Sequence, residues 1–125
     1  MIQTDKAQQT MSIDIVIRGV TGATVMDLHG RLDLHSRWHV KAVMNQCCIT
    51  ETEHLILNLK GLTFVDSAGL GFLVICSRKF QDLNRQITWI YAPGFVGDLL
   101  MSLQLQELIP LCTSEQEALS SSSSL

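Results

Sequence analysis

The stretch Leu59-Lys60-Gly61-Leu62-Thr63-Phe64-Val65-Asp66-Ser67-Ala68-Gly69-Leu70-Gly71-Phe72-Leu73 decides the fold of this chain. The apolar run His54–Leu59 predicts a strand that enters it through a short glycine-containing turn. The apolar spacing that follows predicts a helix from Ala68 to about Leu83. The stretch therefore reads as a strand, a turn and a helix in direct succession.

Two unusual features mark the junction between that strand and that helix. An acid and a hydroxyl, Asp66 and Ser67, stand side by side where the helix should begin. Two glycines follow within the first turns, Gly69 and Gly71. Each glycine should cost about 1 kcal/mol relative to alanine inside a helix. We therefore expect that this site needs bare backbone, as a contact surface would.

Composition limits the classes of protein to consider. The chain has 125 residues, of which 46% are hydrophobic and 17% are charged, so it is the size of one domain with a substantial core. A formal net charge of −3 argues against nucleic acid or an anionic membrane as the main partner. The polar first ten residues lack the apolar core of a signal peptide, and the apolar run Phe72–Cys76 is too short to cross a bilayer. A cytoplasmic protein is the expectation.

The four cysteines form no C-x-x-C pair, so we expect neither a metal site nor a cofactor, and we predict buried thiols. We also expect Trp38 and Trp89 to lie in the core or to be half-buried.

Periodicity along the rest of the chain predicts an α/β fold. The predicted strands are Ser12–Arg18, Ala23–Leu32, His54–Leu59, Gln86–Tyr91 and Leu108–Leu111. The predicted helices start near Ser36, Ala68, Pro93 and Ser114 and run to Cys47, Leu83, Leu103 and Leu119. This order predicts a single domain with a mixed sheet of about five strands, an initial antiparallel hairpin, parallel inner strands and about four helices.

The expected organisation has three parts. Residues 1–11 form a flexible N-terminal leader, residues 12–119 form the domain, and residues 120–125 form a serine-rich flexible tail.

The Asp66-Ser67 pair would lie at the carboxyl end of a parallel strand, where sites of such sheets gather. A serine nucleophile is disfavoured because Val65 stands where a nucleophile elbow has glycine and the histidines form no motif. An aspartyl-phosphate site is disfavoured because the first strand offers only Asp14 as a further carboxylate. Two interpretations remain open. Ser67 is either a phosphorylated switch at a helix N-terminus, or simply an N-cap with Asp66 as a turn residue.

The segment Leu57–Gly71, with its D-S-x-G-L-G core, closely resembles the signature of STAS domains of the bacterial anti-sigma factor antagonists. The resemblance extends from about Ser12 to Leu119 and includes Gly30-Arg31-Leu32-Asp33 and the Ser114–Leu119 region. Asn58 stands where many members carry aspartate.

The resemblance implies a function in partner switching. In that family the serine of the D-S pair, here Ser67, is phosphorylated by a cognate serine kinase that is also the anti-sigma factor. The unphosphorylated antagonist binds this kinase and frees a sigma factor, and a serine phosphatase resets the phosphorylated form. Asp66 matches the acid that supports kinase recognition. The implied partner-binding residues are Gly30, Asp33, Asp66, Ser67, Ala68, Gly69, Leu70 and Gly71.

The resemblance also leaves an alternative, because STAS domains occur as freestanding accessory subunits that bind the ATPase of a lipid or anion transporter. In either case the chain is expected to be a binding protein and not an enzyme, with no direct contact to nucleic acid or membrane. Weak homodimerisation stays open.

Overall fold

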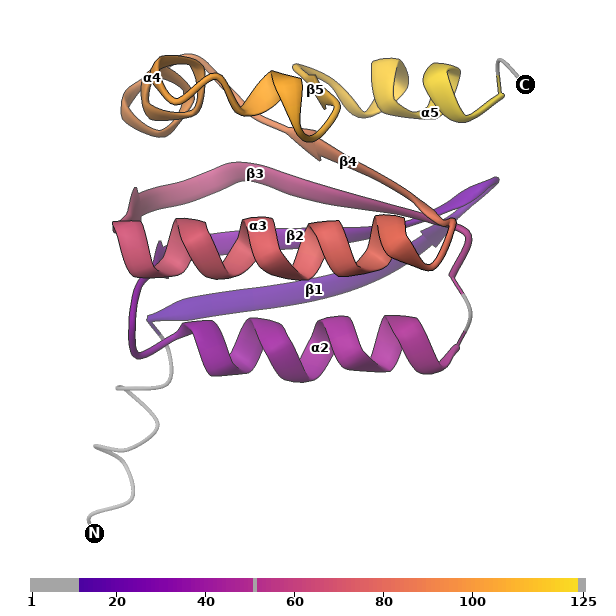
Figure 1. Ribbon diagram of the computed structural model, residues 1–125, viewed down its shortest axis with the longest axis horizontal. Coiled ribbons are helices and arrows are strands. Elements are labelled where there is room, and N and C mark those ends of the chain that lie inside the picture. The colour runs from indigo at the N-terminus through magenta and orange to yellow at the C-terminus, as the bar shows by residue number, and fades with distance from the viewer. Residues whose placement is uncertain (1–11, 51, 124–125) are drawn as a thin grey trace, which may run out of the picture.

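A five-stranded sheet with the strand order β1-β2-β3-β4-β5 forms the centre of the molecule (Figure 1). The computed structural model describes residues 12–50 and 52–123, without the side chains of residues 48, 49 and 121–123. The strands are β1 (Ile13–Val20), β2 (Ala23–Leu32), β3 (His54–Val65), β4 (Gln86–Ile90) and β5 (Leu111–Cys112). The helices are α2 (Arg37–Ile49), α3 (Ser67–Asp82), α4 (Phe95–Ser102) and α5 (Glu115–Ser123), with a 3₁₀ turn, η1, at Leu105–Glu107. The predicted N-terminal leader, residues 1–11, lies outside the described residues.

The sheet is mixed, as predicted. β1 and β2 pair antiparallel through the two-residue turn Thr21–Gly22, and Gly22 has a φ of +88°, which suits glycine. β2, β3, β4 and β5 all pair in parallel. The single α/β domain with an initial hairpin and parallel inner strands is therefore confirmed.

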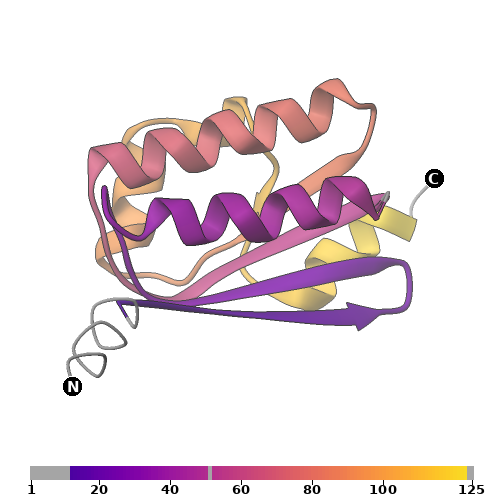
Figure 2. The same cartoon turned by 90° about the horizontal axis from the view of Figure 1, so that it is seen from below.

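Helices cover both faces of the sheet, and strand alternation explains why. Leu55 and Leu57 belong to a large core beneath α2 and α3, whereas Ile56 between them faces a smaller core closed by Ala118 of α5. Figures 1 and 2 show α2 and α3 lying side by side on one side of the sheet. Within the described residues no helix is long and apolar enough to cross a membrane.

An ion-pair network ties α5 to the smaller face. Arg18 of β1 donates to Asp27 of β2 at 2.6 Å and to Glu115 of α5 at 2.8 Å. Asn58 of β3 also donates to Asp27 at 2.7 Å. Asp27 is only 9% exposed, so these bonds hold a buried carboxylate that joins the first three strands.

β3 is longer than predicted. The sequence predicts that it ends at Leu59, but it continues to Val65, and the expected turn at Lys60–Gly61 is strand. The pairing with β2 absorbs the extra length through two register shifts, between Asp27 and His29 and between Gly30 and Arg31. A Cβ on Gly61 would overlap the His29 ring, so this glycine permits close strand approach and does not make a turn.

Other boundaries also differ. β5 begins at Leu111, three residues after the predicted start, so Pro110 precedes the edge strand and only its carbonyl joins the sheet, accepting from the Trp89 N–H at 3.0 Å. α5 continues past the predicted end at Leu119 to Ser123, into the serine-rich run.

The tryptophans behave differently from each other. Trp89 is fully buried, as predicted, and its Nε1 donates to Ser77 at 3.0 Å. Trp38 is 55% exposed, so its predicted burial is wrong. The buried stripe of α2 contains Val40 and Met44, and Trp38 lies two residues before Val40, about 200° away around the helix.

Candidate functional site

The candidate site forms where β2 and β3 end side by side. Leu32 pairs with Val65 at the carboxyl ends of these parallel strands, so Asp33 and Asp66 follow at the same edge of the sheet. The Leu32 carbonyl also accepts the Asp66 N–H at 3.2 Å. Parallel pairing thus brings together two segments that are distant in sequence. It also places the D-S pair at the carboxyl end of a parallel strand, as predicted.

Asp66, and not Ser67, is the N-cap of α3. Its backbone is extended, with φ −103° and ψ 175°, and its Oδ1 accepts the Gly69 N–H at 2.7 Å. The Asp66 carbonyl accepts the first helical bond, from the Leu70 N–H at 2.9 Å. The interpretation of Ser67 as an N-cap is therefore wrong, because the acid before it does that work.

Ser67 is consequently an exposed residue at the first position of α3. The N–H groups of Ser67 and Ala68 precede the first bond of the helix ladder, so the helix end has donors and a positive partial charge beside the hydroxyl. This arrangement suits an anion attached to Ser67.

The two glycines of this turn have different roles. Gly69 is buried, and a Cβ there would lie 2.5 Å from the Leu32 carbonyl oxygen, so its bare backbone lets α3 approach the end of β2. Gly71 is exposed, and a Cβ there would meet nothing within 4 Å. A contact role fits Gly71, whereas internal packing already explains Gly69.

Asp33 organises the turn before α2. Its Oδ1 accepts the N–H groups of His35 and Ser36, both at 3.0 Å. These backbone hydrogen bonds hold the pKa of the Asp33 carboxyl below its ordinary value, and the bond from the Ser36 N–H has the largest effect. The Ser36 hydroxyl accepts the Asp33 N–H and donates to the Arg31 carbonyl, so its side chain stabilises the turn before α2.

Gly30 is also explained by internal contacts. Its φ is +110°, and a Cβ there would overlap the Ser12 carbonyl oxygen. Among the predicted partner-binding residues, Gly69 and Leu70 are buried, and Gly30, Asp33, Asp66 and Ala68 are partly covered. Ser67 and Gly71 are the exposed members of the set.

An open apolar groove of about 800 Å³ begins at Ser67 and runs between α3 and the α4 region. Phe95 and Leu103, which are 60% and 52% exposed, form one side, and Gly71 and Ile75 form part of the other. The helix predicted from near Pro93 to Leu103 was not expected to form part of the site. The useful signal was the apolar periodicity of a helix only eight residues long.

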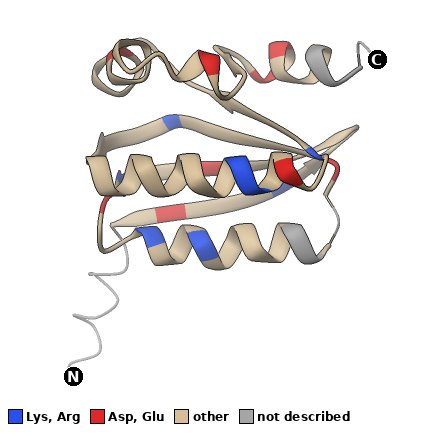
Figure 3. Ribbon diagram, in the orientation of Figure 1, with Lys and Arg blue, Asp and Glu red and all other residues tan. Residues whose placement is uncertain are grey.

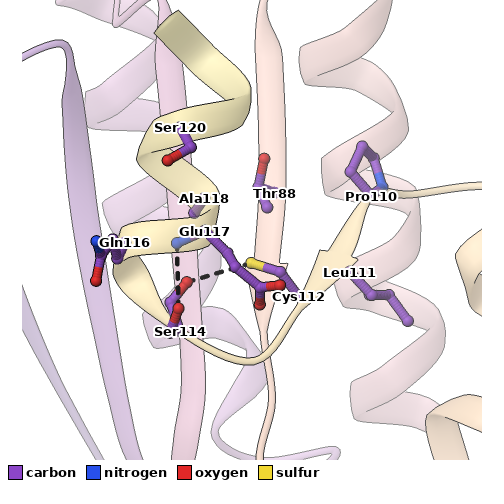
Figure 4. Close-up of a pocket in the computed structure, with 9 residues that line it drawn as sticks. All are labelled: Thr88, Pro110, Leu111, Cys112, Ser114, Gln116, Glu117, Ala118 and Ser120. Atoms are coloured by element: carbon purple, nitrogen blue, oxygen red, sulfur yellow. Dashed lines mark hydrogen bonds between the residues drawn. The ribbon is translucent and has the colours of Figure 1, made fainter. Parts of the chain in front are cut away.

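A second pocket, of about 600 Å³, lies between β4, β5 and α5 and carries Cys112 and Glu117 (Figure 4). Its polar groups bond to one another. Ser114 accepts the Glu117 N–H at 3.1 Å, and Glu117 accepts the Thr113 N–H at 2.9 Å, a close variant of a capping box. Burial raises the pKa of the Cys112 thiol, which lowers its reactivity. This pocket stabilises the start of α5, and its groups form no nucleophile–base pair.

Comparison with known proteins agrees with this fold. The STAS domain family model matches residues 14–118. An anti-sigma F factor antagonist of Paenibacillus polymyxa is 34% identical over 110 residues, which cover 87% of this chain and 94% of that protein.

Solved structures show the same fold. The crystal structure of an anti-sigma factor antagonist from Mycobacterium paratuberculosis is similar with a TM-score of 0.81 at 17% identity, covering 88% of this chain and 93% of that one. The Bacillus cell fate determinant SpoIIAA in its phosphorylated form is similar with a TM-score of 0.66 at 20% identity, covering 86% and 98%. This chain belongs to the STAS domain family, and within it the resemblance is to the anti-sigma factor antagonists.

Proposed function

We propose that this chain is an anti-sigma factor antagonist that binds an anti-sigma factor with serine kinase activity and is switched off by phosphorylation of Ser67. The observation that carries the proposal is the exposed Ser67 hydroxyl at the first position of α3, beside the apolar groove. The relative named as an anti-sigma F factor antagonist supports the same partner class. In this role the chain acts in the cytoplasm as a binding protein and as a kinase substrate, not as a catalyst.

The physical basis of the switch is local. A phosphate on Ser67 adds a charge of about −1.5 to −2 at neutral pH. The helix end stabilises that charge by about 0.3–1 kcal/mol, which offsets part of its repulsion from Asp66. A partner that fits the bare hydroxyl and the groove meets both bulk and negative charge after modification. Phosphorylation therefore breaks the complex without unfolding the domain, and a serine phosphatase restores binding.

Incubation with the cognate kinase and ATP tests the proposal. Intact-mass analysis should show one added phosphate on the native chain and none on Ser67→Ala. Ser102→Ala is the matched control, because Ser102 is an exposed serine at the end of α4. Continued phosphorylation of Ser67→Ala would refute the site. Copurification with a membrane ATPase, and no binding to a kinase, would instead favour the transporter-subunit alternative.

A further inference from the structure

An exposed aromatic residue on α2 has no role in the function proposed above. The Trp38 side chain lies on the face of α2 opposite the buried stripe and is 55% exposed. Its ring meets Phe72 of α3 edge-on, with 6.2 Å between centroids and 61° between planes. An exposed indole held by a second aromatic ring is a feature of binding surfaces, where tryptophan is enriched.

Two cations frame this indole. The Arg37 guanidinium carbon lies 4.7 Å and the Lys41 Nζ 5.4 Å from the centre of the Trp38 ring. Neither cation has an acidic neighbour on its own helix, because α2 contains no Asp or Glu. Arg37 Nε is buried and has no hydrogen-bond acceptor among the described residues. We call Arg37, Trp38, Lys41 and Phe72 the α2 patch.

The cations of the α2 patch lie at the unfavourable end of their helix. Arg37 is the first residue of α2 and Lys41 is one turn later, near the positive end of the helix dipole. A sequence selected only for stability would place acids there. The combination of misplaced cations and an exposed indole therefore favours a role in binding.

The charge of the neighbouring surface has the same sign. α2 and α3 together carry Arg37, Lys41, Arg78 and Lys79 and a single acid, Asp82, although the whole chain has a net charge of −3. In Figure 3 the blue segments of these two helices contrast with the red segments on α4 and α5. The helix layer is thus a basic surface on an acidic protein.

We propose that the α2 patch binds an acidic polypeptide segment that carries one apolar side chain. The apolar side chain packs on Trp38 and Phe72, and flanking carboxylates pair with Arg37 and Lys41. The patch begins at the same end of the sheet as Ser67, since α2 and α3 follow the paired carboxyl ends of β2 and β3. A segment bound here can belong to a protein that also contacts Ser67. Recognition at the α2 patch does not depend on phosphorylation.

Peptide titration of the full chain, followed by NMR, tests this proposal. The probe is a capped peptide with one phenylalanine flanked on each side by two glutamates, and a lysine version serves as the charge control. The Trp38 indole N–H signal should shift with the glutamate peptide and stay in place with the lysine peptide. The Trp89 indole, bonded inside the core to Ser77, is an internal control that should not move.

Two charge-reversal variants locate the binding. Lys41→Glu should weaken the peptide at least about fivefold, because an exposed attraction becomes a repulsion. Lys79→Glu changes the charge equally but lies two turns, about 10 Å, beyond Phe72 along α3 and should have little effect. Circular dichroism checks that both variants fold. Trp38→Ala should remove peptide binding. Phosphorylation of Ser67 in this variant is measured separately.

The proposal is overturned if the two peptides bind equally, or if Lys79→Glu weakens binding as much as Lys41→Glu. Vesicles containing phosphatidylserine form a separate arm and should leave Trp38 fluorescence unchanged, since two cations are too few for stable membrane attachment. A response to vesicles without a response to the acidic peptide would assign the α2 patch to lipid and refute the proposal. Failure of Ser67 phosphorylation would refute the proposed function alone.

Discussion

The two glycines at the start of α3 allow one substitution to be tested in two different surroundings. Gly69→Ala and Gly71→Ala each gain about 1 kcal/mol of helix propensity. At Gly69 the new methyl group would lie 2.5 Å from the Leu32 carbonyl oxygen and 2.8 Å from its carbon, both backbone atoms. That oxygen also accepts the Asp66 N–H, so it cannot move without disturbing the cap. At Gly71 the methyl group meets nothing within 4 Å.

The difference between the two variants isolates the packing cost, since the gain in propensity cancels. Overpacking of this kind costs about 1–3 kcal/mol, so Gly69→Ala should be less stable than Gly71→Ala by that amount. The corresponding difference in Tm is about 4–12 °C for a domain of this size. Gly71→Ala should be up to about 1 kcal/mol more stable than the native chain.

Urea denaturation followed by circular dichroism, with thermal melts in parallel, measures both variants against the native chain. Equal stability of the two variants would show that α3 does not press against the end of β2. A less stable Gly71→Ala would show that Gly71 has a structural role that the open space around it does not explain.

Two further predictions concern carboxylates. Asp66→Ala should reduce the free energy of unfolding by about 1 kcal/mol, because the Gly69 N–H loses its acceptor, and Asp66→Asn should restore most of it; equal losses in urea titrations would refute the capping role. The Arg18 hydrogen bond holds the pKa of Asp27 below its ordinary value, so the folded state favours the ionised form. The stability that the ionised Asp27 contributes is complete at neutral pH. It is lost as the pH falls below about 5 and through the lowered pKa of Asp27. Asp27→Asn should therefore be less stable at pH 7 and show a flatter decline in urea midpoint towards pH 3, and a decline as steep as that of the native chain would contradict this.

The fold could be predicted from the sequence because the periodicity of apolar residues indicates most of the helices and strands. The alternation at Ile13, Ile15 and Ile17 and the apolar run from His54 mark strands that the structure confirms. The end of β3 could not be predicted, because Gly61 resembles turn chemistry. Its real constraint is the His29 ring on the neighbouring strand, which only the three-dimensional pairing brings close.

The candidate site was predictable where chemistry is local and not where it depends on packing. The D-S pair identified the helix start, although capping falls to Asp66 rather than Ser67. The other side of the groove, formed by exposed residues of the α4 region, could be recognised only from the tertiary structure. Trp38 was a different kind of error, because its angular distance from Val40 could have been read from the sequence.

Burial divides the residues of the signature around Ser67 into a buried group that supports the helix end and an exposed group on its surface. Gly69 and Leu70 are buried, and Asp66 is fixed by its cap, so these residues set the position of the helix end. Ser67 and Gly71 are exposed on that fixed support. A phosphate on Ser67 therefore changes the exposed surface more than the buried residues beneath it. The helix dipole stabilises the phosphate charge in the folded domain by about 0.3–1 kcal/mol. The opposing effect on a partner, the desolvation and repulsion of a dianion at an apolar groove, is worth several kcal/mol. In the proposed switch, this difference in magnitude would let one small modification end binding while the domain remains folded.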